Sequence, residues 1–295
     1  MNFHVICDSS CDISFEQEKE LAIGIVPYYV SFDGEIYRKE RLEISTEEFY
    51  KEMVEHPDVF PKTSVPPLTD YYDAFRPYAE KGEPVIYLNL TSHFSSSFQS
   101  VKLVAEELME TYPGWEMAVI DSISATIQEG LLVTEAAKMA KAGIPFAEAV
   151  ERIEKLKTTS RIFFTTADLS YLQKGGRIGK VLKEAAIALK IKPIMSMHDG
   201  ELFPEGIARS RKRSLQKILS DAKAFFKEKE INAYRIAIGY GYDKEERDSF
   251  YEEVRNAMQD IGFLGEVECW QIGSTIGVHT GPYPIGIVAM KKYDA

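Results

Sequence analysis

The chain has 295 residues, 45% hydrophobic and 27% charged, so it can bury a large core and is long enough for two domains. Its formal net charge of −11 argues against a general binder of nucleic acids or anionic membranes, because such binding depends on many lysine and arginine side chains. No stretch is long and apolar enough to span a bilayer, and no signal-peptide pattern precedes the first predicted strand. We therefore expect a folded, cytoplasmic protein without stable membrane insertion.

The three cysteines, Cys7, Cys11 and Cys269, form no Cys-x-x-Cys pair. In a cytosolic chain such cysteines are expected to be reduced thiols with a structural role. Cys7 and Cys11 are close enough in sequence to leave a disulfide or a pair of metal ligands open as alternatives. We predict that the chain holds no metal and no cofactor.

The first half of the chain alternates predicted strands with predicted helices. Apolar runs indicate strands over residues 3–7, 23–30, 85–90 and 116–120. The run at 85–90 is almost wholly apolar, as in a buried parallel strand. Helices are expected from near Ser14, from Ser45 with Glu48 as a capping box, after residues 66–67, after Ser96, and over residues 127–142 and 145–158. This alternation predicts an α/β fold with a mostly parallel sheet.

Serine and threonine residues gather at four strand ends or helix starts in this half, at residues 9–10, 63–64, 91–97 and 122–126. Ser96 with Gln99 is predicted to form a capping box, which would place free backbone amides of a helix N-terminus beside it. Because the carboxyl ends of parallel strands meet at one edge of a sheet, these groups are expected to form a neutral, donor-rich pocket for an oxyanion. Ordinary helix capping explains each stretch equally well when it is taken alone.

The second half has strands expected over residues 161–165, 191–197, 201–208, 234–240, 266–272 and 285–290, and helices over residues 180–189, 213–229 and 244–261. Arg177 follows two glycines in a predicted tight turn, where it is either a solvated residue or a guanidinium that pairs with a carboxylate or phosphate. His279 lies in a predicted loop over residues 273–282, flanked by Gly, Ser and Thr. A lone loop histidine is more often structural, but near Arg177 its pKa would respond to a bound anion.

Six motifs occur in the same order as in the DegV family of bacterial fatty-acid-binding proteins, which the chain resembles over nearly its whole length. Residues 5–12 resemble the family's Asp-Ser-Thr opening, residues 63–66 its Thr-Ser-Gln-Pro loop, and residues 95–100 its Ser-Gly-Thr-Tyr-Gln-Ser loop. Residues 171–179, 191–194 and 279–282 match the family closely. Each motif alone is weak, whereas six in the same order are specific.

The resemblance implies two α/β domains: residues 1–159, a three-layer α/β/α domain with a mostly parallel sheet, and residues 160–295, an α/β domain with a mixed sheet. It implies one long-chain fatty acid, with its tail in an apolar tunnel of the second domain and its carboxylate on hydroxyls of the first. Thr63 and Ser95 would bind the carboxylate, the Ser96 amide would help, and Arg177 and His279 would complete the network. The ligand-binding residues so implied are Thr63, Ser64, Ser95, Ser96, Arg177, His279 and Thr280.

Members of this family present the carboxylate to a separate ATP-dependent fatty acid kinase, which makes an acyl phosphate for phospholipid synthesis. The resemblance therefore implies an acyl carrier with no catalytic residues and with such a kinase as its partner. The chain departs from the family's pattern at Ser96 (usually Gly), Pro67 (usually Ser), residues 128–130 (usually Gly-Gln-Gly) and residues 283–284 (usually Gly-Ala). None of these changes removes a head-group residue, but Ser96 and Tyr283 alter the mouth of the site, where a kinase would dock.

Two enzyme classes compete with a carrier. A serine hydrolase acting on lipid esters would use Ser95 or Ser96 with His279 and an aspartate such as Asp8, but the chain lacks a Gly-x-Ser-x-Gly elbow around these serines. A kinase-like enzyme is suggested by the resemblance, since the family's fold is related to a dihydroxyacetone kinase subunit. The chain has no Gly-x-x-x-x-Gly-Lys-Ser/Thr loop and no obvious cluster of Mg²⁺-binding carboxylates, which disfavours ATP chemistry.

Overall fold

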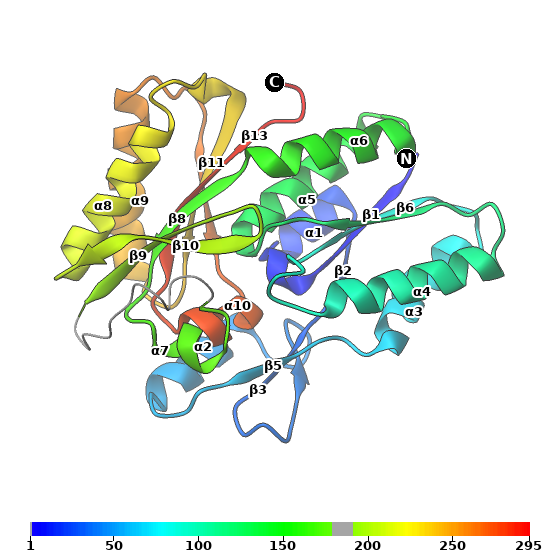
Figure 1. Cartoon of the computed structure of the whole chain (residues 1–295), viewed down its shortest axis with the longest axis horizontal. Coiled ribbons are helices and arrows are strands. Elements are labelled where there is room, and N and C mark those ends of the chain that lie inside the picture. Colours follow the sequence, from blue (N-terminus) through cyan, green and yellow to red (C-terminus); the bar gives the residue numbers. More distant parts are fainter. Residues whose placement is uncertain (1, 179–190) are drawn as a thin grey trace.

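The computed structural model describes residues 2–178 and 191–295. The helix expected over residues 180–189 lies outside the described residues, as does Gly179 of the predicted turn. The strands form a four-stranded sheet, a six-stranded sheet and a small three-stranded sheet. Figure 1 shows the two larger sheets side by side with helices between and around them.

The four-stranded sheet is parallel throughout and has the order β2-β1-β6-β7. Its strands are β1 (His4–Asp8), β2 (Ile23–Val26), β6 (Val85–Asn89) and β7 (Met117–Asp121). All five residues of β6 are buried, which confirms the buried parallel strand predicted from its apolar run.

Helices cover both faces of the parallel sheet. On one face, α3 (Leu68–Ala79) and α4 (Ser97–Thr111) pack against β1, β6 and β7 through one hydrophobic cluster. The other face carries α1 (Phe15–Leu21), α5 (Thr126–Lys141) and α6 (Phe146–Leu156). This three-layer arrangement is the one expected for the first half of the chain.

One of the two predicted capping boxes is present, at Ser45, and a further capping box begins the helix expected near Ser14. Ser14 caps α1 together with Gln17, and Ser45 caps α2 (Thr46–Glu55) together with Glu48. The capping box predicted for Ser96 and Gln99 is wrong, because Ser96 makes no capping hydrogen bond with its side chain. Its φ of −78° and ψ of −1° are helical, whereas a capping side chain needs an extended backbone to turn back onto the first amides.

The small three-stranded sheet is antiparallel. The apolar run at 23–30 divides at Pro27 into β2 and β3 (Tyr29–Ser31), and β3 pairs with β4 (Arg38–Lys39) and β5 (Lys62–Ser64). Val30 lies opposite Thr63 in this ladder. Thr63 is therefore fixed by strand pairing, in addition to the prolines that follow it.

The six-stranded sheet is mixed and has the order β10-β9-β8-β13-β11-β12. Its strands are β8 (Arg161–Thr165), β9 (Lys192–His198), β10 (Glu201–Ala208), β11 (Tyr234–Tyr240), β12 (Val267–Gln271) and β13 (Ile285–Lys291). Only the pair β11 and β12 is parallel within this sheet. Helices α8 (Arg211–Phe225) and α9 (Lys244–Asp260) cover the face that lies to the left in Figure 1.

Helix α5 is the layer that both large sheets share. It is buried on nearly every side and packs against β1 on one side and against β11 and β13 on the other. A Cβ atom on Gly130 would lie 2.2 Å from the carbonyl oxygen of Cys11 and 2.6 Å from the Trp270 ring, so only glycine allows this approach. We keep residues 1–159 and 160–295 as the proposed domains, with α5 packed between their sheets.

The segment over residues 273–282, predicted as a loop, contains the helix α10 (Ser274–Thr280). A second short helix, α7 (Ser170–Lys174), precedes the two glycines and Arg177. Both were missed because each is only about two turns or less, too short for a 3.6-residue pattern to be visible. His279 therefore lies in the last turn of a helix. Within the described residues, short 3₁₀ helices also occur over residues 9–11, 157–159 and 231–233.

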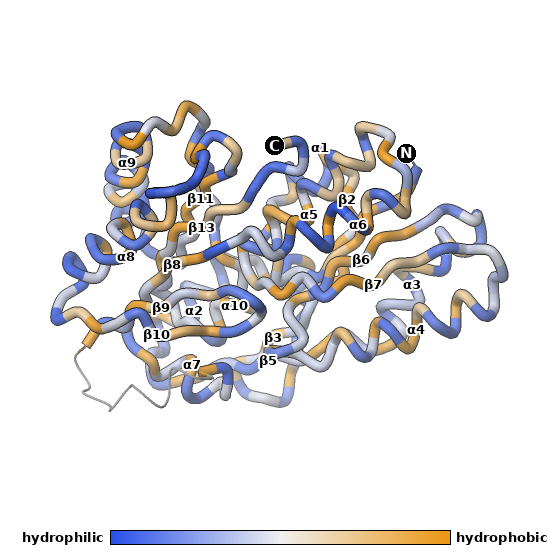
Figure 2. The backbone as a smooth tube through the Cα atoms, turned by 45° about the horizontal axis from the view of Figure 1, so that its top comes forward, coloured by the Kyte–Doolittle hydropathy of each residue, from blue (hydrophilic) through white to orange (hydrophobic). Residues whose placement is uncertain are grey.

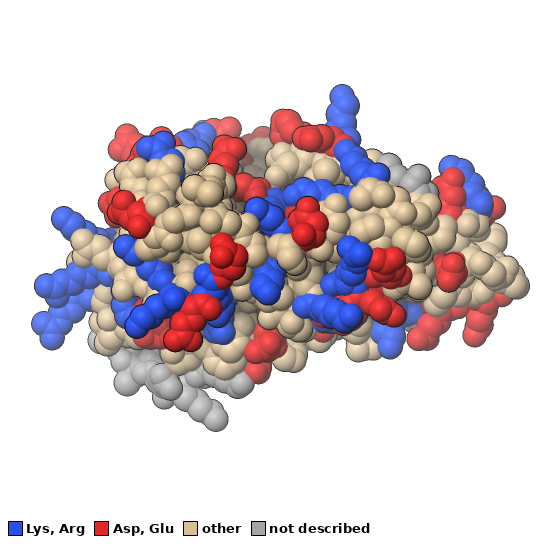
Figure 3. Space-filling model, turned by 90° about the horizontal axis from the view of Figure 1, so that it is seen from above, with Lys and Arg blue, Asp and Glu red and all other residues tan. Residues whose placement is uncertain are grey.

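Hydropathy along the backbone and the charged residues on one face are shown in Figures 2 and 3. In Figure 2 the strands β6 and β13 are coloured mainly as hydrophobic, whereas α9 on the outside alternates between hydrophobic and hydrophilic. Figure 3 shows lysine, arginine, aspartate and glutamate side chains interspersed over one face of the molecule. Among the described residues, no helix has the length and apolar character needed to cross a membrane.

Candidate ligand-binding site

A deep cavity lies where α10, β5 and the loop after β6 meet the six-stranded sheet. It holds about 980 Å³ of space not filled by protein atoms, its open mouth included. Most of its wall is apolar and comes from both halves of the chain: Val65, Leu90, Phe94, Ala125, Ile127, Ile162, Phe164, Leu172, Met197, Leu202, Ile272, Ile276, Pro284 and Ile285. Such a wall suits the hydrocarbon part of a ligand.

Five of the seven predicted site residues line this cavity. They are Thr63, Ser95, Arg177, His279 and Thr280. The Ser64 and Ser96 side chains are not part of the wall, and Ser96 is exposed. The Thr280 hydroxyl donates to the carbonyl oxygen of Ile276 at 3.0 Å.

His279 contacts Thr63 across the cavity, with 3.2 Å between Nε2 of the ring and the threonine hydroxyl. Burial, together with the positive charge of Arg177, lowers the pKa of His279 to about 4, so the ring is neutral at physiological pH. Nδ1 is buried and has no hydrogen-bond partner among the described residues. A Cβ on Gly175 would lie 2.2 Å from Nδ1, so the glycine after α7 lets the backbone close over the ring.

Arg177 is held by two backbone carbonyls. Its Nε donates to the Phe94 carbonyl at 3.1 Å and its Nη1 donates to the Gly175 carbonyl at 2.6 Å. Because His279 is neutral, Arg177 is the only positive charge among the described residues that line the cavity. The guanidinium keeps further N–H groups that these two bonds do not use.

Tyr28 is a member of the polar end that the sequence analysis missed. Its buried hydroxyl lies 2.9 Å from the Ser95 hydroxyl and 2.7 Å from the Ser97 hydroxyl. Ser95 also accepts a hydrogen bond from the Ser97 amide at 3.2 Å. A tyrosine directly after Pro27, where the apolar run breaks, was the available signal, since a buried tyrosine needs a partner for its hydroxyl.

Four buried carboxyl groups lie behind the cavity rather than in it. They belong to Asp8, Asp12, Glu40 and Glu129. Burial raises the pKa of each, that of Asp8 to about 6. Asp8 accepts hydrogen bonds from the Leu90 amide at 2.8 Å and from both the amide and the hydroxyl of Ser10. Its buried carboxyl group therefore holds these two segments together and does not face a ligand.

These contacts give no support to a catalytic triad. Asp8 is engaged with Ser10 and Leu90, and within the described chain no carboxylate orients Nδ1 of His279. A hydrolase would need that orienting bond to hold the ring for proton transfer from Ser95.

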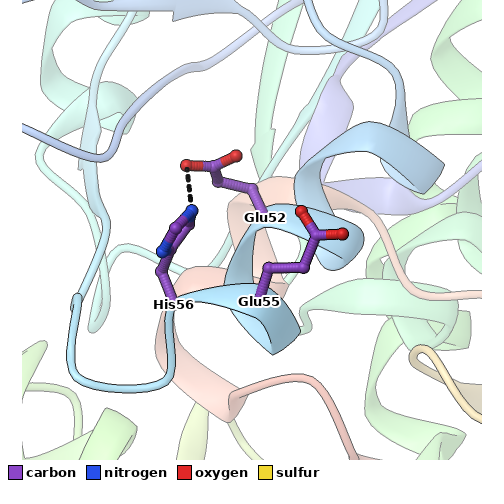
Figure 4. Close-up of side chains that lie close together, drawn as sticks. All are labelled: Glu52, Glu55 and His56. Atoms are coloured by element: carbon purple, nitrogen blue, oxygen red, sulfur yellow. Dashed lines mark ion pairs between the residues drawn. The ribbon is translucent and has the colours of Figure 1, made fainter.

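One group of side chains has the composition of a metal site. Glu52, Glu55 and His56 lie close together at the end of α2, and Figure 4 shows His56 paired with Glu52, their side-chain atoms 3.6 Å apart. Glu55 and His56 are exposed, and such groups at helix ends are common without an ion. We assign no metal function to it.

Comparisons with known proteins show the family to which the chain belongs. A profile of the family described as "Uncharacterised protein, DegV family" matches residues 2–292. The chain belongs to the DegV family. A DegV domain-containing protein from Clostridium acetobutylicum is 30% identical over 290 residues, which is 98% of either chain.

Solved DegV structures match the whole fold. A stearic-acid-binding protein from Eubacterium ventriosum has a TM-score of 0.94 and 38% identity, with 99% of each chain covered. A fatty-acid-binding DegV family protein from Thermus thermophilus has a TM-score of 0.87 and 26% identity, covering 99% of this chain and 100% of its own. The predicted α/β fold, with a parallel sheet in the first half and a mixed sheet in the second, is confirmed.

Proposed function

We propose that this DegV protein binds one long-chain fatty acid, with the tail in the apolar cavity and the carboxylate at its polar end. The observation that carries the proposal is that Thr63 and Ser95, from distant parts of the chain, line one cavity whose remaining wall is largely apolar. The head-group residues are proposed to be Thr63, Ser95, Arg177 and His279, with Thr280 beside them and Ser64 and Ser96 contributing through the backbone.

The two parts of such a ligand make different contributions. Burying a sixteen-carbon tail at roughly 0.8 kcal/mol per methylene offers on the order of 12 kcal/mol before entropy costs. A carboxylate taken out of water without partners would cost several kcal/mol. Arg177 supplies a charge and Thr63 and Ser95 supply hydroxyl donors, so the tail provides affinity and the polar end fixes orientation.

We further propose that the protein is an acyl carrier without catalysis of its own. It would present the carboxylate to a separate ATP-dependent fatty acid kinase in the cytoplasm, and the acyl phosphate would enter phospholipid synthesis. Support comes from membership of the family, from the lack of a phosphate-binding Gly-rich loop, and from the lack of an orienting carboxylate on His279 among the described residues.

Organic extraction of the purified protein followed by mass spectrometry tests the ligand. We expect one fatty acid per protein molecule, whereas an empty protein that hydrolyses lipid esters would support the hydrolase instead. The kinase step is tested by adding the kinase and ATP to the loaded protein. His279→Ala is expected to reduce acyl-phosphate formation more than fatty acid binding, and an unchanged rate would make His279 a structural residue.

A further inference from the structure

Two threonines line the cavity away from the residues assigned to the head group. Thr275 lies on α10, one helical turn or ~6 Å before His279 and on the same face of the helix. Thr126 begins α5. Both side chains are almost wholly buried, with exposed fractions of 3% for Thr275 and 7% for Thr126.

Glu40 accepts a hydrogen bond from the hydroxyl of Thr275. Oε2 of Glu40 accepts from the Thr275 hydroxyl at 2.6 Å, and Oε1 accepts from the Thr275 amide at 2.9 Å. Oε2 also accepts a hydrogen bond from the Ser9 hydroxyl at 2.6 Å. The Ser9 hydroxyl in turn accepts a hydrogen bond from the Tyr28 amide at 2.9 Å. The carboxylate is thus surrounded by donors, and the Thr275 hydroxyl, whose proton is engaged, keeps only lone pairs for a further partner.

Thr126 also has its hydroxyl hydrogen-bonded to a buried carboxyl group. Its hydroxyl donates to Oδ2 of Asp12, whose Oδ1 accepts from the Gly273 amide at 2.8 Å. The backbone of Thr126 has a φ of +55°, a costly conformation for a β-branched residue, so the surrounding contacts must hold it there. Both threonine hydroxyls are thus hydrogen-bonded to buried carboxyl groups.

A plain hydrocarbon chain makes no use of these acceptors. An apolar wall without an acceptor would reject a hydroxylated chain, because burying an unpaired hydroxyl is costly. We infer that the cavity has a second polar subsite, centred on Thr275 with Thr126 beside it, that accepts a hydrogen bond from a hydroxyl group on the acyl chain. This inference rests on the proposed fatty-acid-binding function and specifies the class of acid: hydroxylated long-chain fatty acids.

Competition for the delipidated full-length protein tests this subsite. The protein is incubated with equal amounts of palmitic and β-hydroxypalmitic acid and, separately, of stearic acid and a stearic acid hydroxylated at mid-chain. Bound lipid is then extracted and the ratio of hydroxylated to plain acid is measured by mass spectrometry. We expect at least one pair to favour the hydroxylated acid about three- to tenfold, the range of one net hydrogen bond.

Two variants locate the effect. Thr275→Val removes the acceptor while keeping the amide that binds Glu40, and it should reverse the preference toward the plain acid. Thr275→Ser keeps the hydroxyl and should keep the preference for the hydroxylated acid. The subsite alone is overturned if the wild type binds the plain acids and prefers neither hydroxylated acid. It is also overturned if Thr275→Val has the same preference for a hydroxylated acid as the wild type. A protein that binds none of the four acids overturns the fatty-acid proposal itself.

Discussion

The hydroxyl of Thr63 and Nε2 of His279 lie 3.2 Å apart although 216 residues separate them in sequence. Thr63 is on β5 of the small sheet and His279 is in the last turn of α10, which follows β12 of the six-stranded sheet. The polar end of the cavity is therefore assembled from both halves of the chain. A change in either half is expected to affect binding of the same carboxylate.

Loss of either head-group hydroxyl should weaken binding without unfolding the protein. Thr63→Val and Ser95→Ala each remove a donor to a charged carboxylate, an interaction typically of about 1.5–3 kcal/mol, so we expect affinity to fall tenfold or more. Calorimetric titration with palmitic acid measures the affinity, and thermal unfolding checks the fold. Ser64→Ala is the matched control, because that hydroxyl does not line the cavity. Full lipid occupancy in both variants would contradict the assigned site.

We expect the charge of Arg177 to stabilise the bound carboxylate of the ligand. Because His279 is neutral, replacing Arg177 with Gln removes the one positive charge that the described part of the chain brings to the cavity wall. We predict an affinity loss of about tenfold or more, with a smaller loss for Arg177→Lys, which keeps the charge but not the planar fork. Added salt should weaken the wild type more than Arg177→Gln. An equal salt response in both proteins would show that this charge does not act on the ligand.

The pKa of His279 predicts how its stability contribution changes with pH. The folded pKa of about 4 lies below the usual value of 6.5, so the unfolded chain binds a proton between these values and the folded chain does not. Stability therefore falls as pH decreases through this window, by about 2 kcal/mol near pH ~5 relative to pH ~7.5. Chemical denaturation of the wild type and of His279→Gln at both pH values measures this change in the free energy of unfolding. The wild type should lose about that much more than the variant, and parallel losses would contradict the assigned pKa.

Most of the architecture could be predicted from the sequence, because its strands and long helices have strong local patterns. The buried strand β6, the helix start near Ser14 and the capping box at Ser45 depend on neighbouring residues only, and the structure has all three. The capping box at Ser96 failed because the preceding turn puts that residue in a helical conformation. Helix α10 was missed because its seven residues include two threonines, a glycine and a histidine, which give little helical pattern.

The site was predictable in composition but not in geometry. Motif order pointed to Thr63, Ser95, Arg177 and His279, and all four line one cavity. Tyr28 reaches that cavity only because β2 ends at Val26 and the chain turns there toward Ser95, a tertiary relationship with no local pattern. The same holds for Glu40, an acidic residue in a hairpin region that is buried by contacts with residues 9 and 275.

Glu40 provides the sharpest test of the buried network. Glu40→Gln keeps size and shape but replaces one acceptor oxygen with an amide that donates. If the amide takes the place of Oε1 it faces the Thr275 N–H, and if it takes the place of Oε2 it faces the Ser9 and Thr275 hydroxyls. Either orientation leaves a buried donor without an acceptor, at a cost of about 1–3 kcal/mol, so we expect a lower free energy of unfolding by that amount.

The matched control for this substitution is Glu47→Gln on α2. The Glu47 side chain is 81% exposed and pairs only loosely with Lys244, at 3.8 Å, so its loss should change stability by less than about 0.5 kcal/mol. Urea denaturation of both variants gives the comparison. Equal stability of Glu40→Gln and the wild type would mean that Glu40 is already protonated and donating, and the Thr275 hydroxyl would then be free to donate into the cavity.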